Sequence, residues 1–187
     1  MKHKKPEPTY IDIEELLESL KKDVPRYSCF AWIGIPDESY IIELKAKGKE
    51  RSLTYWLKLQ QDTDGNYQVI LDVPNEQEKL IWSKDPLQEK KPDIQNEDSK
   101  IKAFIIADEY IIDNFYDNVN LLLLNALWRE DPASEKQLSF IRSNKLYPEE
   151  DITKGEAFII IGLINYLKSK TTSASKGKNE FCFKREK

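Results

Sequence analysis

Between Tyr27 and Trp82 the chain alternates apolar and polar residues in five short runs, and this pattern limits the possible folds more than any other. Alternation with a period of two puts apolar side chains on one face of a β-strand. We expect strands at about residues 27–35, 39–46, 51–60, 66–73 and 78–83. Proline, glycine, asparagine and aspartate separate the runs. Because links this short favour antiparallel pairing, the pattern predicts a five-stranded antiparallel meander.

Helical spacing precedes and follows the predicted sheet. Thr9 and Asp12 fit a capping box, which predicts an N-terminal helix that Pro25 ends. After the sheet, the spacing of apolar residues predicts a helix over about 98–115 and a further, buried helix over about 120–129.

The C-terminal part contains two clear helix starts. Capping boxes occupy residues 134–137 and 153–156, where a Ser or Thr is followed three residues later by Gln or Glu. Each begins an apolar, helix-spaced run, so two helices joined by an extended link are expected. Trp128 is expected to be largely buried where the central helices meet this pair. The predicted class is therefore α+β: an N-terminal helix, an antiparallel five-stranded meander, central helices and a C-terminal helix–extended–helix subdomain.

Composition divides the chain into four parts. Residues 1–8 are a basic lead that we expect to be flexible, and residues 9–118 form the α+β domain. Residues 119–169 form the helical subdomain. Residues 170–187 hold six Lys or Arg residues against two Glu and little apolar area, so a disordered basic tail is expected there.

The sequence has no recognisable catalytic motif, although its 33 Asp and Glu residues leave an enzyme that uses carboxylates alone as a third possibility. His3 is the single histidine, and it lies in the flexible lead. No glycine-rich phosphate-binding loop is present, so Asp108 and Glu109 are expected on the wet face of a helix. Cys29 and Cys182 fit neither a disulfide framework nor a metal site, and Cys29 is expected to be a buried thiol. We therefore expect no enzyme activity, no cofactor and no metal.

Two further properties bear on where the protein acts. No apolar stretch approaches the roughly 20 residues that a membrane-spanning helix needs, and no apolar signal segment follows the basic N-terminus. We expect a cytoplasmic protein with no membrane partner. The formal net charge is −4, so a nucleic-acid site requires positive charge that is concentrated locally.

The predicted sheet is rich in aromatic residues. In the run Leu53 to Leu59, Thr54, Trp56 and Lys58 alternate with apolar residues. If Trp56 lies on an open face beside Lys58, that face could stack nucleic-acid bases. Aromatic residues are also favoured in strands, so burial of these rings in the core is the alternative.

The C-terminal helix pair is a second candidate site. Lys136 and Lys154 lie in the first turns of the two predicted helices, where free backbone N–H groups attract phosphate. Arg142, Lys145 and the basic tail add positive charge. The alternative is a small helical subdomain that only packs onto the rest of the chain.

The segment Trp128 to Arg142 resembles the Trp-Arg…Pro-Ala-Thr-Glu-Lys-Gln segment near the C-terminus of bacterial, notably cyanobacterial-type, DEAD/DEAH-box helicases of superfamily 2. The run Asp151 to Ala157 is similar to the Leu-Thr-Lys-Gly-x-Ala run that follows it there, and residues 107–111 match more loosely. Ser134 stands in place of threonine and keeps the helix cap. The resemblance implies a helicase-associated accessory module that helps to engage DNA or RNA. It implies no ATPase activity, because the motor motifs are absent from this sequence.

We therefore expect a non-catalytic, nucleic-acid-binding accessory module, either part of a larger protein or a free-standing relative that works in trans. The candidate contacts are Lys136, Arg142, Lys145, Lys154, Trp56 and Lys58. The alternative is a protein–protein adaptor that docks a helicase motor or another protein through the aromatic face or an edge of the sheet.

Overall fold

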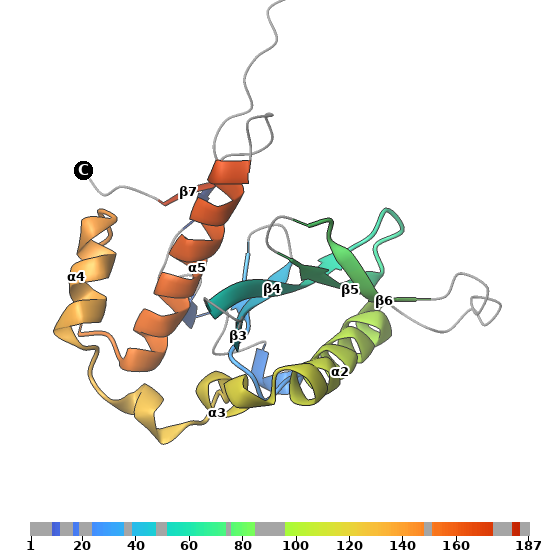
Figure 1. The fold of residues 1–187 in the computed structure, drawn as a ribbon, viewed down its shortest axis with the longest axis horizontal. Coiled ribbons are helices and arrows are strands. Elements are labelled where there is room, and N and C mark those ends of the chain that lie inside the picture. Colours follow the sequence, from blue (N-terminus) through green and yellow to red (C-terminus); the bar gives the residue numbers. More distant parts are fainter. Residues whose placement is uncertain are drawn as a thin grey trace, which may run out of the picture. The chain divides into compact units, whose positions relative to one another are not determined.

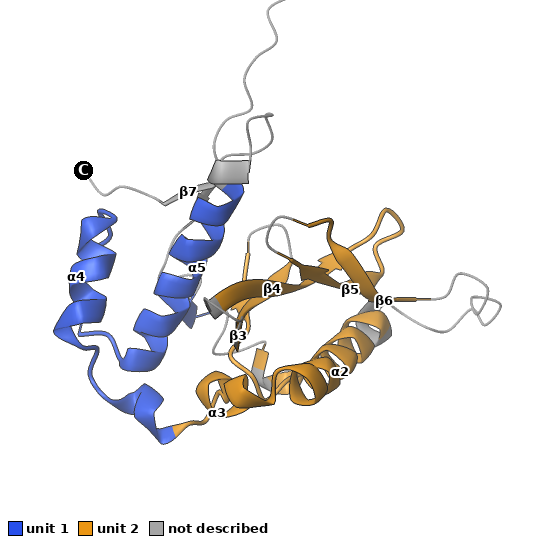
Figure 2. Ribbon diagram, in the orientation of Figure 1, with its two compact units in different colours: residues 1–18, 127–187 blue, residues 19–126 orange. Residues whose placement is uncertain are grey.

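The computed structural model describes residues 9–11, 17–18, 24–35, 39–47, 52–73, 76–84, 96–147, 151–173 and 181–183. The chain forms two compact units (Figure 2). Unit 2 comprises residues 19–126, and unit 1 comprises residues 1–18 together with residues 127–187. The sequence predicts a division after residue 118; in the structure residues 119–126 belong to unit 2, and the N-terminal segment belongs to unit 1.

Unit 2 contains the predicted five-stranded antiparallel meander (Figure 1). Its strands, in spatial order, are β2 (Ile33–Gly34), β3 (Tyr40–Lys47), β4 (Ser52–Gln61), β5 (Tyr67–Asp72) and β6 (Lys79–Ser83). Every neighbouring pair is antiparallel, which confirms the prediction. β2 is much shorter than the predicted strand because the residues before it adopt other structure and make other pairings. Val24–Arg26 form the 3-10 helix η1, and Phe30 pairs with Leu123.

The helix α2 (Asn96–Asn114) packs on one face of this sheet, close to the predicted span of 98–115. Its inner side consists of the fully buried residues Ala103, Phe104, Ala107 and Ile111. The Phe104 ring is the centre of an aromatic cluster, in contact with the rings of Tyr27, Trp32 and Tyr40 at centroid separations of 5.6, 5.6 and 5.1 Å. Ile42, Leu57 and Leu71 lie side by side across three strands, and each is at most 5% exposed. Apolar burial between α2 and the sheet thus forms the core of unit 2.

The chain after α2 differs from the buried helix predicted over 120–129. It forms the 3-10 helix η3 (Tyr116–Asn118) and the short helix α3 (Val119–Leu122). At Leu123 the backbone leaves the helical region, with φ −52° and ψ 126°. The predicted helix is therefore wrong beyond its first turn.

Long-range hydrogen bonds explain this break. The N–H of Ala31 donates to the carbonyl oxygen of Leu122 at 2.8 Å, and the N–H of Leu124 donates to that of Cys29 at 2.8 Å. The segment before β2 thus takes the backbone partners that a continued helix would use, and tertiary context overrides local helix propensity. Cys29, which was expected to be buried, is exposed at this junction.

Asp108 joins α2 to the same segment. Ser28 Oγ donates to its carboxylate at 2.8 Å, and Trp32 Nε1 donates at 3.3 Å to Asp108 and at 3.0 Å to Ser28 Oγ. Burial raises the pKa of Asp108 to about 6, although these hydrogen bonds favour the ionised form. Of the two acids expected on the wet face of the helix, Glu109 is exposed and Asp108 is half-buried.

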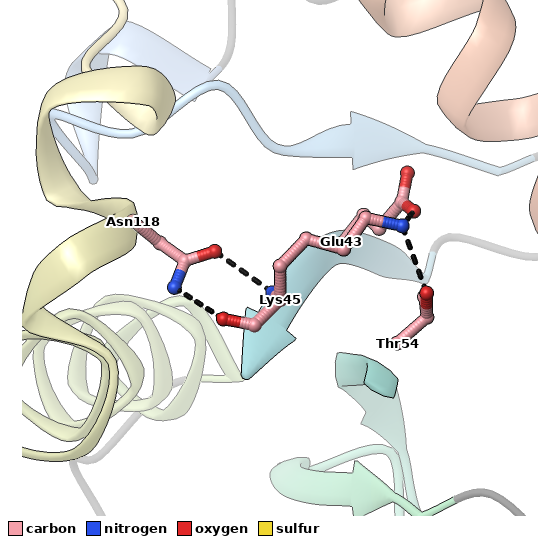
Figure 3. A network of polar contacts seen from close by, with 4 residues as sticks. All are labelled: Glu43, Lys45, Thr54 and Asn118. Carbon is pink, nitrogen blue, oxygen red and sulfur yellow. Dashed lines mark hydrogen bonds and ion pairs between the residues drawn. The ribbon is translucent and has the colours of Figure 1, made fainter. Parts of the chain in front are cut away.

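A side chain closes the edge of β3 beyond the end of β2 (Figure 3). β2 pairs with β3 only at Tyr40 and Ile41. Further along β3, Asn118 Oδ1 accepts from the Lys45 N–H at 2.8 Å, and Asn118 Nδ2 donates to the Lys45 carbonyl oxygen at 2.7 Å. The Lys45 ammonium is paired with Glu43 and donates to Thr54 Oγ1 at 2.8 Å. Asn118, which is 5% exposed, thus takes the place of a neighbouring strand.

Unit 1 contains the predicted pair of C-terminal helices. Its elements are the 3-10 helix η4 (Leu127–Glu130), α4 (Glu135–Ser143), α5 (Lys154–Ser173), and a parallel strand pair of β1 (Thr9–Ile11) and β7 (Phe181–Phe183). Among the described residues, no helix has both the length and the apolar character that crossing a membrane requires.

Both ends of the sequence differ from expectation. The capping box predicted at Thr9 is wrong because this residue begins a strand; Leu17–Glu18 are helical, and the rest of the predicted N-terminal helix before Val24 lies outside the described residues. Within the tail that was expected to be disordered, residues 170–173 continue α5 and residues 181–183 form β7. The lead at 1–8 and the segments 174–180 and 184–187 lie outside the described part of the chain.

Candidate nucleic-acid interface

Both predicted capping boxes are present, at the starts of α4 and α5. Ser134 Oγ accepts from the N–H of Gln137 at 3.3 Å, and Gln137 Oε1 accepts from the N–H of Ser134 at 3.0 Å. At α5, Thr153 Oγ1 accepts from the N–H of Glu156 at 3.2 Å, and Glu156 Oε2 accepts from the N–H of Thr153 at 2.9 Å. Each box uses two of the N–H groups that a helix start leaves free, so fewer donors remain for a phosphate.

The two helix starts are also bonded to each other. The N–H of Ala133 donates to the carbonyl oxygen of Ile152 at 2.9 Å, and the N–H of Lys154 donates to that of Asp131 at 2.7 Å. Gln137 Nε2 donates to the carbonyl oxygen of Lys154 at 3.4 Å. These contacts bring the first turns of α4 and α5 together at the same end of the pair, so the helices lie side by side in Figure 2.

Trp128 and Arg129 pack against the first turn of α5. The Arg129 guanidinium lies 4.7 Å from the centroid of the Trp128 ring and 4.9 Å from that of Phe158. Gly155 permits this approach, because a Cβ there would lie 2.8 Å from the Cβ of Arg129. Arg129 is 6% exposed, and burial lowers its pKa to about 10. Trp128, expected to be largely buried, is half-buried, and Arg129 holds the interior position.

The N-terminal end of the helix pair carries acids beside its predicted phosphate-binding lysines. Lys136 is exposed, with Glu135 before it in the first turn of α4. The Lys154 ammonium donates to Asp131 Oδ2 at 2.8 Å, and Glu156 lies in the first turn of α5. Positive charge is therefore not concentrated at this end. Nor do acids gather into a metal site: no group of three or more His, Cys, Asp and Glu side chains in the described residues could hold an ion.

The C-terminal half of the pair has the opposite charge distribution. The sequence contains no Asp or Glu over residues 138–147 or 157–173. Its charged residues are Arg142, Lys145, Lys168 and Lys170, of which the first three are exposed and Lys170 is half-buried. Lys168 Nζ lies 5.2 Å from the centroid of the Phe140 ring, so this lysine of α5 reaches across to α4. We call Arg142, Lys145, Lys168 and Lys170 the basic end.

Sequence reasoning identified most of the basic end. It selected Arg142 and Lys145, and its basic tail of residues 170–187 included Lys170, but it missed Lys168, which follows a long apolar run. The absence of acids between Glu156 and Glu180 was the available signal, because an acid-free helix half leaves its lysines uncompensated.

Trp56 and Lys58 belong to unit 2 and are not open to solvent. Trp56 is 5% exposed and Lys58 is 6% exposed. The Lys58 ammonium is paired with the Glu78 carboxylate. Other rings of this region are also buried, namely Phe30, Trp32 and Tyr67. A base-stacking face needs exposed rings. These rings are buried, as the alternative interpretation of the sequence expected.

Two half-exposed tyrosines, Tyr27 and Tyr40, contact the ammonium group of Lys100. Lys100 Nζ lies 5.2 Å from the ring centroid of Tyr27 and 4.8 Å from that of Tyr40, and it donates to the Tyr40 hydroxyl at 2.7 Å. The ammonium thus binds α2 to the aromatic side of the sheet. These two rings are engaged within unit 2.

Comparison with known proteins identifies a family for this chain. A protein-family model described as the C-terminal domain of mitochondrial helicase Irc3 matches residues 12–185, which is most of the chain. A search of curated proteins and a search of solved structures each found no match. The matched range contains the Trp-Arg segment, both capping boxes and the basic end. The chain therefore belongs to the family of the C-terminal domain of mitochondrial helicase Irc3 and is a helicase-associated domain.

Proposed function

We propose that this domain is a non-catalytic accessory region of a superfamily 2 helicase that binds DNA or RNA through the basic end of the α4–α5 pair. The observation that carries the proposal is the segregation of charge along this pair. Acids accompany the lysines at the capped end, whereas Arg142, Lys145 and Lys168 are exposed within two stretches of sequence, 138–147 and 157–173, that contain no acid. Three acids, at positions 149–151, follow the first stretch in the link to α5. A chain with net charge −4 can bind a polyanion if its positive charge is grouped in this way.

Phosphate contacts account best for such a site. Lysine and arginine on adjoining helices can follow the sugar–phosphate backbone, and contacts of that kind position a protein without reading its sequence. The basic residues also complement the negative C-terminal ends of both helix dipoles, so part of their effect is structural. Base stacking through Trp56 receives less support, because that ring is buried.

Salt dependence tests the proposal directly. Labelled single- and double-stranded oligonucleotides are titrated with the full chain at several salt concentrations, beside the triple variant Arg142→Gln, Lys145→Gln, Lys168→Gln. Each lost phosphate contact should lower the slope of log affinity against log salt by about 0.7 to 0.9, so the triple variant should lose about 2 to 3 in slope. The loss should be similar for all base sequences.

The matched control is the pair Lys136→Gln and Lys154→Gln at the capped end, which should change the slope much less. If this pair weakens binding as much as the triple variant does, the site lies at the helix N-termini instead. If the intact chain binds no oligonucleotide at about 50 mM salt, where phosphate contacts are strongest, the function is not nucleic-acid binding.

A further inference from the structure

The outer side of α2 carries a row of exposed apolar side chains. Ile101, Ile105 and Ile112 are 37%, 49% and 45% exposed, and Tyr116, just beyond the helix, is 75% exposed. At 100° per residue the three isoleucines fall within an arc of about 40° around the helix axis. They form one line along the helix, which we call, together with Tyr116, the α2 stripe.

Packing among the described residues of unit 2 does not account for the α2 stripe. The helix already buries a different side, formed by Ala103, Phe104, Ala107 and Ile111, each with no exposed surface. A helix that packs on one side ordinarily carries polar residues on the other. Single exposed apolar residues are common in folded proteins, but several of them on one side of a helix mark a surface that binds something, here interrupted only at Asp108, which bonds to Ser28 and Trp32.

The charges beside the α2 stripe are mainly acidic. Glu109, Asp113 and Asp117 are exposed on α2 and in the turn after it. Lys102 lies near the other end of the stripe, with its ammonium 5.7 Å from the centroid of the Trp82 ring. An acidic border repels a nucleic acid. A second copy of the chain is also disfavoured as the partner. If two α2 helices packed antiparallel through their stripes, with the contact centred midway between Ile105 and Ile112, the two Glu109 side chains would come together and repel each other.

We propose that the α2 stripe docks an amphipathic helix of a protein partner whose apolar side is bordered by lysine or arginine. Aliphatic side chains spaced three and four residues apart on the partner would pack between the isoleucines of the stripe. Its basic border would face Glu109 and Asp113, which fixes the orientation of the docked helix and speeds its association. The α2 stripe and the basic end consist of different residues, so this proposal does not depend on the proposed nucleic-acid binding.

Two designed peptides provide the test. Each has about 20 residues, close to the length of α2, with leucine at positions i, i+4, i+7 and i+11. One has arginines beside the leucines and its twin has glutamates there. Binding to the full chain is measured by calorimetry. The arginine peptide is expected to bind at least about tenfold more tightly than its twin, which corresponds to about 1.4 kcal/mol.

Variants separate the apolar and the charged parts of the surface. Ile105→Glu should weaken binding of the arginine peptide at least about tenfold. The double variant Glu109→Lys, Asp113→Lys leaves the isoleucines in place and should reverse the preference between the peptides. The matched control is Leu80→Glu: Leu80 is 54% exposed on β6, where it pairs with Ile70, and should leave binding unchanged. Circular dichroism establishes that each variant is folded.

Several outcomes overturn the proposal. They are failure of the arginine peptide to bind, equal binding of both peptides, and an equal effect of Leu80→Glu and Ile105→Glu. Self-association of the chain that Ile105→Glu abolishes, measured by light scattering, would assign the α2 stripe to a second copy. Loss of oligonucleotide binding in Ile105→Glu alone would assign it to nucleic acid. The oligonucleotide titration of the triple variant at the basic end reports on the other proposal independently.

Discussion

The carboxylate of Asp108 accepts hydrogen bonds from Ser28 and Trp32, and yet burial raises its pKa from 3.8 to about 6. The hydrogen bonds therefore replace only part of the hydration that the ionised group loses on folding. At neutral pH Asp108 is therefore ionised, although its surroundings favour the protonated form more than water does. Its titration is consequently linked to the stability of unit 2.

We expect the free energy of unfolding of the wild-type chain, relative to Asp108→Asn, to rise as the pH falls from about 7 to about 4. The unfolded carboxyl titrates near 3.8 and the folded one near 6, so between these values the folded state binds more protons. The rise is about 3 kcal/mol at most. Urea unfolding of both proteins at several pH values measures it. A difference between them that does not change with pH would contradict the assignment.

Burial of single residues in the Trp-Arg segment could not be predicted from sequence. Size and hydrophobicity favour Trp128 as the interior residue, whereas Arg129 is the buried one. The reason lies at Gly155, 26 positions after Arg129. Gly155 lets the aliphatic part of the Arg129 side chain approach α5, and the Arg129 guanidinium packs against the Phe158 ring. A contact of this kind leaves no trace in the local pattern around residue 129.

At the scale of secondary-structure elements, the edge of β3 is covered by a side chain. Asn118 takes over where the neighbouring strand β2 ends. Asn118 meets both the N–H and the carbonyl group of Lys45, as the amide group of a strand residue would. Open strand edges can pair with other chains, so this arrangement protects the sheet as well as stabilising it. It also fastens η3, and with it the chain after α2, to the sheet.

Asn118→Ala is expected to lower the free energy of unfolding by about 1–3 kcal/mol, because it leaves two part-buried backbone groups of Lys45 without this partner. Asn118→Asp keeps the acceptor and loses the donor, so it also destabilises. The control is Asn114→Ala. Asn114 is exposed and its side chain donates to the carbonyl oxygen of Tyr110 at 3.0 Å, so its loss should cost about 0.5 kcal/mol or less. Thermal unfolding measures all three, and equal effects of the two alanine variants would count against the role of Asn118.

Elements that depend on residues close together in the sequence could be predicted. Elements that depend on contacts between residues far apart in the sequence could not. The meander follows from alternation and short turns, and the caps at Ser134 and Thr153 follow from residues three positions apart. The capping pattern at Thr9 also looked sufficient, but Thr9 pairs with Phe181 in a strand near the other end of the sequence. The candidate site divides in the same way. Exposed cations of α4 could be found from charge, whereas the burial of Trp56 depends on tertiary packing.

At the scale of the whole molecule, the two units differ in continuity. Unit 2 is one uninterrupted stretch, residues 19–126, whereas unit 1 needs residues from both ends of the chain. Contacts between neighbouring strands and α2 close the core of unit 2 within that stretch. It can therefore form before the rest of the chain is available, while unit 1 requires a contact of very large sequence separation.

We expect residues 19–126, expressed alone, to fold into the meander and α2, and residues 127–187 alone to be less stable than the same residues in the full chain. Circular dichroism and the dispersion of amide NMR signals report on each fragment. A fragment 19–126 without a cooperative unfolding transition would show that unit 2 is not an independent folding unit.

The pairing of β1 with β7 has a mechanical consequence. The strands are parallel, with Thr9 opposite Phe181 and Ile11 opposite Phe183. Tension on the chain before β1 and after β7 draws the strands past each other along their length, so their hydrogen bonds carry the load together; antiparallel strands would be peeled apart one bond at a time. Resistance to such a force depends on the rate of rupture and not on equilibrium stability. β1 and β7 thus act as a clamp in shear, and a pull along the chain reaches unit 2 only after the clamp has slipped.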